Sequence, residues 1–142
     1  KAFEHLAQET AAAGLPVSYL PMNLLELRSL LSTSALLAHR PGQRVLMGRH
    51  LVDALDARGR RNLMRSADML LRGGGRLYLE FLVERGEDNA AGPHVHPVLP
   101  RRVRADVEAA GGRVIHREIL LASSGSERTA SHICRMVAQW DR

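Results

Sequence analysis

Two polar residues of this chain stand at the ends of segments that have the pattern of β-strands. Apolar and polar residues alternate in Leu77–Phe81, and Glu80 is one residue short of the apolar end. A carboxylate there can orient a reacting group, act as a base if burial raises its pKa, or form a salt bridge with a nearby arginine. Arg49 follows another apolar run, and open α/β sheets bind ligands at the ends of parallel strands. Arg49 therefore predicts either a ligand contact or an ion pair with a local carboxylate such as Asp53.

The histidines and the cysteine do not form a convincing metal-binding pattern. His94 and His96 have the His-x-His spacing seen in zinc sites, but zinc needs further ligands. His116 and His132 belong to a distant hairpin, so no metal site is predicted. The single cysteine, Cys134, alternates with apolar residues, which favours a buried structural thiol. It cannot form an internal disulfide, and this cysteine usage favours a cytoplasmic setting.

Composition limits the partners that are expected. The 142 residues are 45% hydrophobic and 25% charged, which suits one globular domain over residues 1–142. No apolar run approaches the roughly 18 residues needed to cross a bilayer, so no membrane association is expected. The net charge of +5 includes arginine clusters at 58–61 and 101–104, but only 4% of the residues are aromatic. The sequence therefore argues against a nucleic-acid partner, and solvated helix faces explain the arginines.

The hydrophobic pattern predicts alternating helices and strands followed by a hairpin. Asn23 is the expected N-cap of the second helix, with Glu26 completing a capping box. Strand–helix alternation implies a parallel sheet with right-handed crossovers, and the hairpin adds antiparallel pairing. The fold class is α/β, with a Rossmann-like, mostly parallel sheet. Helices are expected over 2–13, from 23 to Pro41, in a segment that ends at Leu71, and from Pro100 to Gly111. Strands are expected over 17–20, 45–47, 77–82, 114–121 and 132–140. A short helical turn is expected over 51–55 and a loop over 84–97.

The run Leu70–Phe81 takes an apolar helix end through three glycines into a strand that carries Glu80. Glycine supplies the positive φ that ends a helix and reverses the chain. This run resembles the segment before the fifth strand of class I S-adenosylmethionine-dependent methyltransferases. The runs Tyr19–Leu24, Val45–Leu55 and Gly111–Trp140 resemble the third-strand end, the fourth strand with its turn, and the closing hairpin of the same family, in the same order.

The resemblance covers nearly the whole chain but only the later two-thirds of a complete family domain, so the fold is expected to be incomplete in its N-terminal half. The glycine-rich cofactor loop and the ribose-binding acid of the family have no counterpart here. Gly73–Gly75 cannot replace that loop, because it precedes a strand instead of following one.

The resemblance implies S-adenosylmethionine as cofactor and methyl transfer to an unidentified acceptor. The implied cofactor-binding residues are Met22, Asn23, Leu24, Gly48, Arg49 and His50, and the implied catalytic residues are Glu80 and His96. Asn23 stands where the family commonly has an acidic residue near the adenine. His96 is expected on a loop that covers the acceptor pocket.

A nucleotide-binding enzyme of another α/β family is a third interpretation, against which the terminal hairpin argues, and two functional alternatives stay open on sequence grounds. The chain is either part of a methyltransferase or a degenerate, non-catalytic domain that serves in interaction or structure. Without a first strand beside 45–47, one strand edge is expected to be unpaired. The isolated chain is then expected to bind S-adenosylmethionine poorly, and to self-associate or take a strand from a partner chain.

Overall fold

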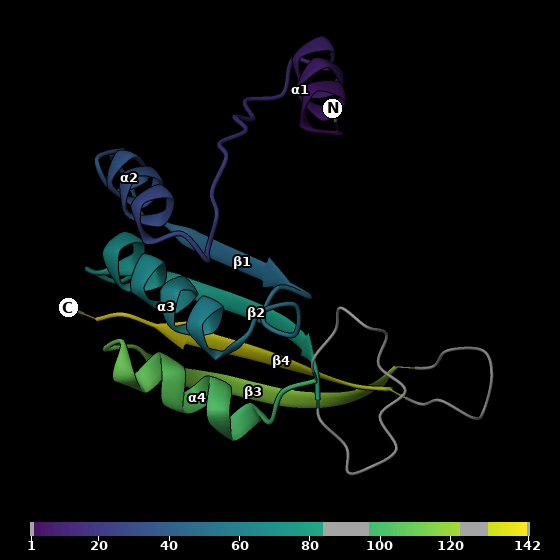
Figure 1. Cartoon of the computed structure of the whole chain (residues 1–142), viewed down its shortest axis with the longest axis vertical. Helices are drawn as coiled ribbons and strands as arrows, with labels where there is room; N and C mark the ends of the chain where they lie inside the picture. Colours follow the sequence, from purple (N-terminus) through teal and green to yellow (C-terminus); the bar gives the residue numbers. More distant parts are fainter. Residues whose placement is uncertain (1, 84–96, 123–130, 142) are drawn as a thin grey trace.

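The computed structural model describes residues 2–83, 97–122 and 131–141, and they form helices packed on a four-stranded sheet (Figure 1). The sheet order is β1-β2-β4-β3, with β1 and β2 parallel and the other two pairs antiparallel. The elements are α1 (Ala2–Ala12), α2 (Leu27–Ala38), β1 (Val45–Arg49), α3 (Ala57–Leu71), β2 (Arg76–Leu82), α4 (Pro100–Ala109), β3 (Arg113–Ala122) and β4 (Ser131–Gln139). The expected α/β fold with a parallel pair and a closing antiparallel hairpin is confirmed.

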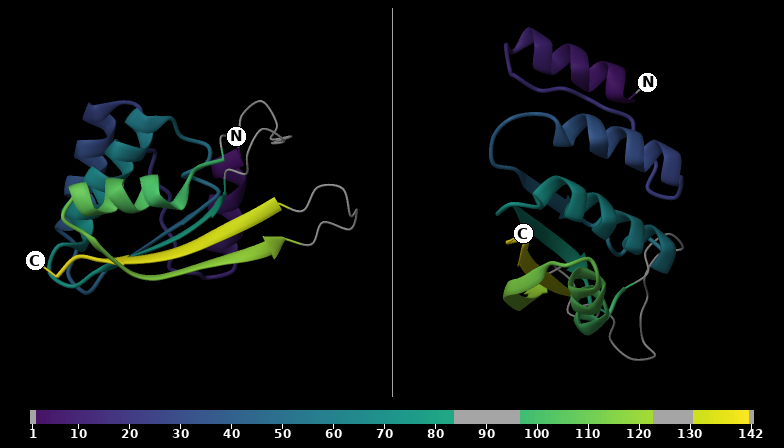
Figure 2. Two further views of the ribbon diagram at one scale, coloured as in Figure 1. Left: turned by 90° about the horizontal axis from the view of Figure 1, so that it is seen from below. Right: turned by 90° about the vertical axis from the view of Figure 1, so that its left-hand side faces the viewer.

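One face of the sheet is covered by helices. In both views of Figure 2, α2, α3 and α4 lie on the same side of the strands. The alternating residues of β2 and β4 that point to this side are buried, as are the apolar residues of α3 and α4. The largest fully buried apolar side chains of the core are Trp140, Phe81, Leu30, Met64, Leu71, Leu77, Met136, Val52, Val103 and Val107. The apolar periodicity of α3 and the alternation in β2 therefore predicted the core correctly.

The other face of the sheet is not covered by any helix of the described chain (Figure 2). Val45 and Met47 of β1 point to that side and are 62% and 79% exposed. In the described residues, β1 pairs with β2 and has no partner on its outer edge. The unpaired edge that the sequence predicted is therefore present, and it carries exposed apolar side chains.

The segment between α1 and α2 differs from its prediction. Residues 15–23 have no regular secondary structure, so the expected strand over 17–20 is wrong. A β-prone run forms a strand only where a neighbouring strand accepts its backbone groups. Here the amide of Val17 donates locally to the carbonyl of Leu15 at 2.8 Å. Helix α1 stands apart from the sheet at the far end of this segment (Figure 1).

The start of α2 is also different. Its N-cap is Glu26, and no side chain caps the first turn, so the expected capping box of Asn23 and Glu26 is wrong. The Asn23 Oδ1 atom instead accepts from the amide of Leu25 at 3.0 Å, a local turn that competes with the helix. The expected helical turn over 51–55 is a hydrogen-bonded turn without a helix. Helix α3 begins after it at the N-cap Asp56, whose side chain accepts from the amide of Gly59.

The glycine run between α3 and β2 has the conformation that the sequence indicated. Gly73 and Gly74 have φ angles of +94° and +112°, which disfavour other residues. The amide of Gly74 donates to the carbonyl of Trp140 at 2.7 Å, and the amide of Trp140 donates to Gly75 at 3.2 Å. The run therefore joins the start of β2 to the end of β4. This contact lies at the opposite end of the strands from Arg49 and Glu80.

We predict that Gly112→Ala destabilises the fold by about 1–3 kcal/mol, because a core side chain is overpacked. A Cβ at position 112 would lie 2.6 Å from the ring of Trp140, whose indole donates to the carbonyl of Ala110. Trp140 is the only tryptophan, so urea unfolding followed by its fluorescence measures the loss.

Gly111→Ala is the matched control for this variant. Gly111 has φ +81°, and the nearest atom to its Cβ position is Asp68 Oδ1 at 4.0 Å, so alanine strains the backbone and leaves the indole undisturbed. The Trp140 emission spectrum of the folded protein should change in Gly112→Ala and not in Gly111→Ala. An unchanged stability of Gly112→Ala would show that the indole can move away at no cost.

Candidate functional site

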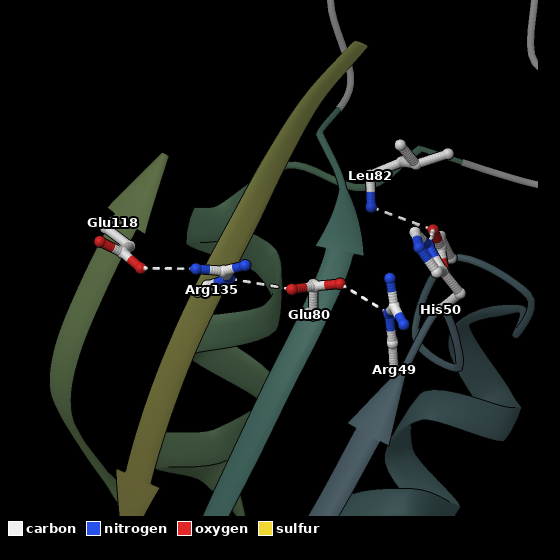
Figure 3. A network of polar contacts seen from close by, with 7 residues as sticks. Arg49, His50, Glu80, Leu82, Glu118 and Arg135 are labelled. Carbon is white, nitrogen blue, oxygen red and sulfur yellow. Dashed lines mark hydrogen bonds and ion pairs between the residues drawn. The ribbon is translucent and has the colours of Figure 1, made fainter. Parts of the chain in front are cut away.

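Four charged side chains form a row across the sheet on its uncovered face (Figure 3). The strand register places Arg49 beside Glu80, Glu80 beside Arg135, and Arg135 beside Glu118. Opposite charges at directly paired positions of neighbouring strands attract each other. We call these four residues the charge row.

The ion pairs of the charge row meet at Glu80. Arg49 Nε lies 2.8 Å from Oε1 of Glu80, and Arg135 Nε lies 2.9 Å from Oε2. Arg135 also lies 3.6 Å from Glu118, which completes the row. Glu80 is only 19% exposed, whereas the side chain of Arg49 is 73% exposed. Arg49 therefore keeps much of its guanidinium accessible to a ligand while Glu80 fixes its position.

The electrostatics of Glu80 favour an ion pair over a catalytic base. The hydrogen bond from Arg135 is the largest cause that lowers its pKa, and Arg49 adds to it, while burial acts in the opposite direction. The same contact raises the pKa of Arg135. A base needs a carboxyl whose pKa is raised toward neutrality. Of the interpretations that the sequence left open for Glu80, the geometry supports the salt bridge.

A cavity of about 530 Å³ lies on the uncovered face around the charge row. This volume is in the range of small-molecule sites. Its lining combines the four charged residues with Met47, Gly48, Tyr78, Leu79, His116, Met136 and Val137. Gly48 has a packing reason to be glycine, because a Cβ there would lie 3.1 Å from a methyl group of Leu79.

A second polar group lies in the turn that follows β1. His50 donates its amide to the carbonyl of Glu80 at 2.8 Å, which extends the pairing of β1 with β2 by one residue. Its ring Nδ1 lies 3.2 Å from Oδ2 of Asp53, and the same oxygen accepts from the amide of Leu82 at 3.0 Å. Asp53 is 1% exposed, and its Oδ1 has no hydrogen-bond partner in the described structure. Figure 3 shows this group beside the charge row.

Sequence reasoning considered Asp53 only as a partner for Arg49 and did not predict its contact with His50. The three-residue spacing of His50 and Asp53 carries no signal without the turn geometry. His50 has φ +50°, the only positive φ of a non-glycine residue in the described chain. This conformation costs about 1–2 kcal/mol for a residue with a Cβ, and such strain is concentrated at functional sites.

The predicted residues Met22, Asn23 and Leu24 lie on a different part of the structure. Thr33 donates to the carbonyl of Pro21 at 3.1 Å, and the amide of Asn23 donates to the Ser29 hydroxyl. The carbonyl of Leu24 accepts from Asn62 of α3 at 2.7 Å. The segment is therefore fastened to α2 and α3, and its residues are not among those that line the cavity.

The structure describes Cys134 but not His96. His96 lies outside the described residues, so its catalytic role stays a prediction. Within 2–83, 97–122 and 131–141, no three histidine, cysteine or acidic side chains gather as they would around a metal ion. No helix in that part of the chain is long and apolar enough to cross a membrane. Cys134 is buried as expected, and its burial raises the pKa of the thiol to about 11.

Comparison with known proteins identifies the fold. A methyltransferase from Clostridium acetobutylicum that depends on S-adenosylmethionine superposes with a TM-score of 0.63 over 99% of this chain, at 6% identity. The N1-methyltransferase of 1,6-didemethyltoxoflavin from Burkholderia thailandensis, which holds S-adenosylhomocysteine, gives 0.54 over 75% at 12% identity. The [4+2]-cyclase SpnF gives 0.60 over 94% at 13% identity.

These likenesses establish the fold of S-adenosylmethionine-dependent methyltransferases and no more. The aligned part is 71% of the Clostridium chain, 48% of the Burkholderia chain and 60% of the cyclase, so this chain spans less than two thirds of the latter two. No protein-family model matches the sequence, and no curated protein matches it. The resemblance found in the sequence is confirmed at the level of the fold.

We predict that the stability contributed by Glu80 disappears at acid pH. Its pKa is lower in the folded state than in the unfolded state, so its contribution is complete above the unfolded value and is lost as the pH falls through the folded value. The difference in unfolding free energy between the native chain and Glu80→Gln should therefore be largest near neutral pH and shrink below about pH 4.5. Urea titrations at several pH values measure it, and a pH-independent difference would contradict the ion pair.

A second prediction separates the backbone of His50 from its ring. His50→Gly and His50→Ala both remove the bond to Asp53, but only glycine adopts φ +50° without strain. Glycine relieves this strain but loses more chain entropy on folding. The net result should be that His50→Gly is more stable than His50→Ala by about 0.5–1 kcal/mol. Thermal unfolding of both variants measures the difference, and a more stable alanine variant would show that the turn relaxes to negative φ.

Proposed function

We propose that this chain is part of an S-adenosylmethionine-dependent methyltransferase, with the reaction taking place beyond the carboxyl ends of β1 and β2. The observation that carries the proposal is the parallel register that brings Arg49 and Glu80 together there, within a methyltransferase fold. Open α/β sheets bind ligands at this end of their strands. The acceptor is a separate small molecule or macromolecule.

The residues present fit one part of the cofactor. The exposed guanidinium of Arg49 suits the carboxylate of the amino-acid portion, because arginine binds carboxylates through paired donors. Gly48 allows close approach of the backbone, and the apolar Met22 and Leu24 are the proposed contacts on the adenine and ribose side. The backbone amide of Asn23 already donates to the Ser29 hydroxyl. When bound, the cofactor supplies a methyl group that is already activated by a sulfonium. The protein then needs to orient the acceptor and exclude water.

Glu80 has a positioning role in this proposal. Its carboxylate holds Arg49 from one side and Arg135 from the other, so Arg49 is presented in a fixed orientation. This replaces the base that one interpretation of the sequence assigned to Glu80. His96 is retained as the residue that covers the acceptor.

The alternative is a non-catalytic domain with the same fold. The [4+2]-cyclase SpnF shares the fold and is named for a different reaction, so the fold by itself does not require methyl transfer. The exposed outer edge of β1, with Val45 and Met47, supports strand addition by a second copy or by another chain. In either case we expect the isolated chain to bind the cofactor weakly.

Titration with S-adenosylhomocysteine, followed in amide NMR spectra, tests the proposed function. Because weak binding is expected, millimolar ligand is used and the map of shifted amides is the result. The amides of Gly48 and Arg49 should shift together with that of Asn23. Adenosine serves as the control ligand, since it lacks the amino-acid portion and should leave Arg49 unshifted. Absence of shifts at these positions would support the non-catalytic alternative.

Arg49→Ala should weaken S-adenosylhomocysteine binding by about tenfold. Loss of a hydrogen bond between charged groups corresponds to about 1.5 kcal/mol, which is a factor of ten in affinity. Arg135→Ala is the matched control, because it removes the other partner of Glu80 without removing the proposed ligand contact. Equal losses in both variants would mean that the charge row acts on the fold and not on the ligand.

A further inference from the structure

The pair His50 and Asp53 has an arrangement that the fold alone does not require. Asp53 is buried, and one carboxylate oxygen, Oδ2, faces both the ring of His50 and the amide of Leu82. The other oxygen is buried without a partner in the described structure. The His50 side chain is 44% exposed, so a buried acceptor is joined to a ring that reaches the surface.

The hydrogen bonds determine which nitrogen of His50 carries the proton in the neutral ring. The amide of Leu82 is a donor, and a carboxylate accepts hydrogen bonds only. The contact of 3.2 Å between Nδ1 and Oδ2 therefore requires the proton on Nδ1. In this neutral ring Nε2 carries the lone pair, and the described residues give it no hydrogen bond, while the side chain as a whole is 44% exposed. An accepted proton at Nε2 would place positive charge beside the buried carboxylate of Asp53.

The position of the pair relates it to the proposed reaction. The amide of His50 binds the carbonyl of Glu80, so the ring starts from the carboxyl ends of the two parallel strands, next to Arg49. The left-handed φ of His50 turns the chain at this point. The histidine lies outside the residues that line the cavity of the charge row, so it forms a separate polar group at the same end of the sheet.

We propose that His50 is the proton acceptor of the methyl-transfer step and that Asp53 is its positioning residue. This inference rests on the proposed function, and it assigns His50 to the acceptor and not to the cofactor. It also names the class of acceptor: a hydroxyl or an amine that carries a proton on the atom to be methylated.

The step balances without a further reactant. The lone pair of the acceptor oxygen or nitrogen forms the bond to the methyl carbon, and the carbon–sulfur bond of the cofactor breaks with its electron pair going to sulfur. The proton of the acceptor passes to Nε2 of His50, and the electron pair of the O–H or N–H bond stays on the acceptor. Solvent then takes the proton from the exposed ring.

The first test measures the tautomer and the contact of His50 in the native chain. Long-range proton–nitrogen NMR of the ¹⁵N-labelled protein reports which ring nitrogen is protonated, and His50→Gln assigns the signals. We expect the proton on Nδ1, and a shift of the Nε2 signal on addition of millimolar phenol. Anisole is the matched probe without the hydroxyl proton, and it should cause no shift. A proton on Nε2, no response to phenol, or an equal response to anisole would each overturn the proposal.

The second test measures the reactivity of the Nε2 lone pair. Diethyl pyrocarbonate acylates unprotonated imidazole nitrogens, and mass spectrometry of peptides gives a rate for each histidine. Asp53→Asn should lower the rate of His50 at least threefold, because the neutral amide oxygen is a weaker acceptor for the Nδ1 proton than the carboxylate and leaves the ring less basic. The rate of His5, which pairs with Glu9 on the separate helix α1, is the internal control. An unchanged His50 rate in a folded Asp53→Asn variant would overturn the proposal.

Failure of the proposed function and failure of the His50 assignment would show in different measurements. The tautomer and the acylation rate are measured without cofactor, whereas titration with S-adenosylhomocysteine reads the cofactor site. If Asp53→Asn does not fold, the tautomer and phenol measurements on the native chain decide the proposal by themselves.

Discussion

The pairing of β2 with a neighbour on each side is the interaction on which the rest of the structure depends. Its parallel register with β1 and its antiparallel register with β4 place Arg49 and Arg135 on the two sides of Glu80. The same alternation that sends Glu80 to the uncovered face sends Leu79 and Phe81 into the core. One set of backbone hydrogen bonds therefore fixes both the packing against the helices and the geometry of the charge row.

The two ends of β2 are held by different devices. At its start, glycines with positive φ bring the backbone against Trp140. At its other end, the buried carboxylate of Asp53 accepts from the amide of Leu82 and contacts His50, which joins the turn after β1 to the end of β2. The contact at the start of β2 depends on glycines, which have no side chain, and it stabilises the sheet. The second uses a buried charge and a strained backbone, a combination that is typical of a site.

The described chain leaves two parts of the sheet exposed, which are the uncovered face and the outer edge of β1. Every helix of residues 2–83, 97–122 and 131–141 that packs on the sheet lies on one side, so no described helix covers Val45, Met47 or the cavity of the charge row. The same fold serves a methyltransferase and a cyclase among the solved structures. Function therefore has to be argued from the polar groups at the strand ends.

Local pattern in the sequence determined the helices, the three longer strands, the glycine turn and the buried face, because each depends on residues close together in the chain. It failed for residues 17–20 and for the Asn23 cap, where tertiary neighbours and a local side-chain bond decide the conformation. Arg49, His50 and Glu80 could be selected because they stand at strand ends. Their partners Arg135 and Asp53 could not, because strand register and the left-handed turn at His50 bring them together. Contacts between residues as distant as Glu80 and Arg135 arise only when the sheet assembles, and only the tertiary structure decides them.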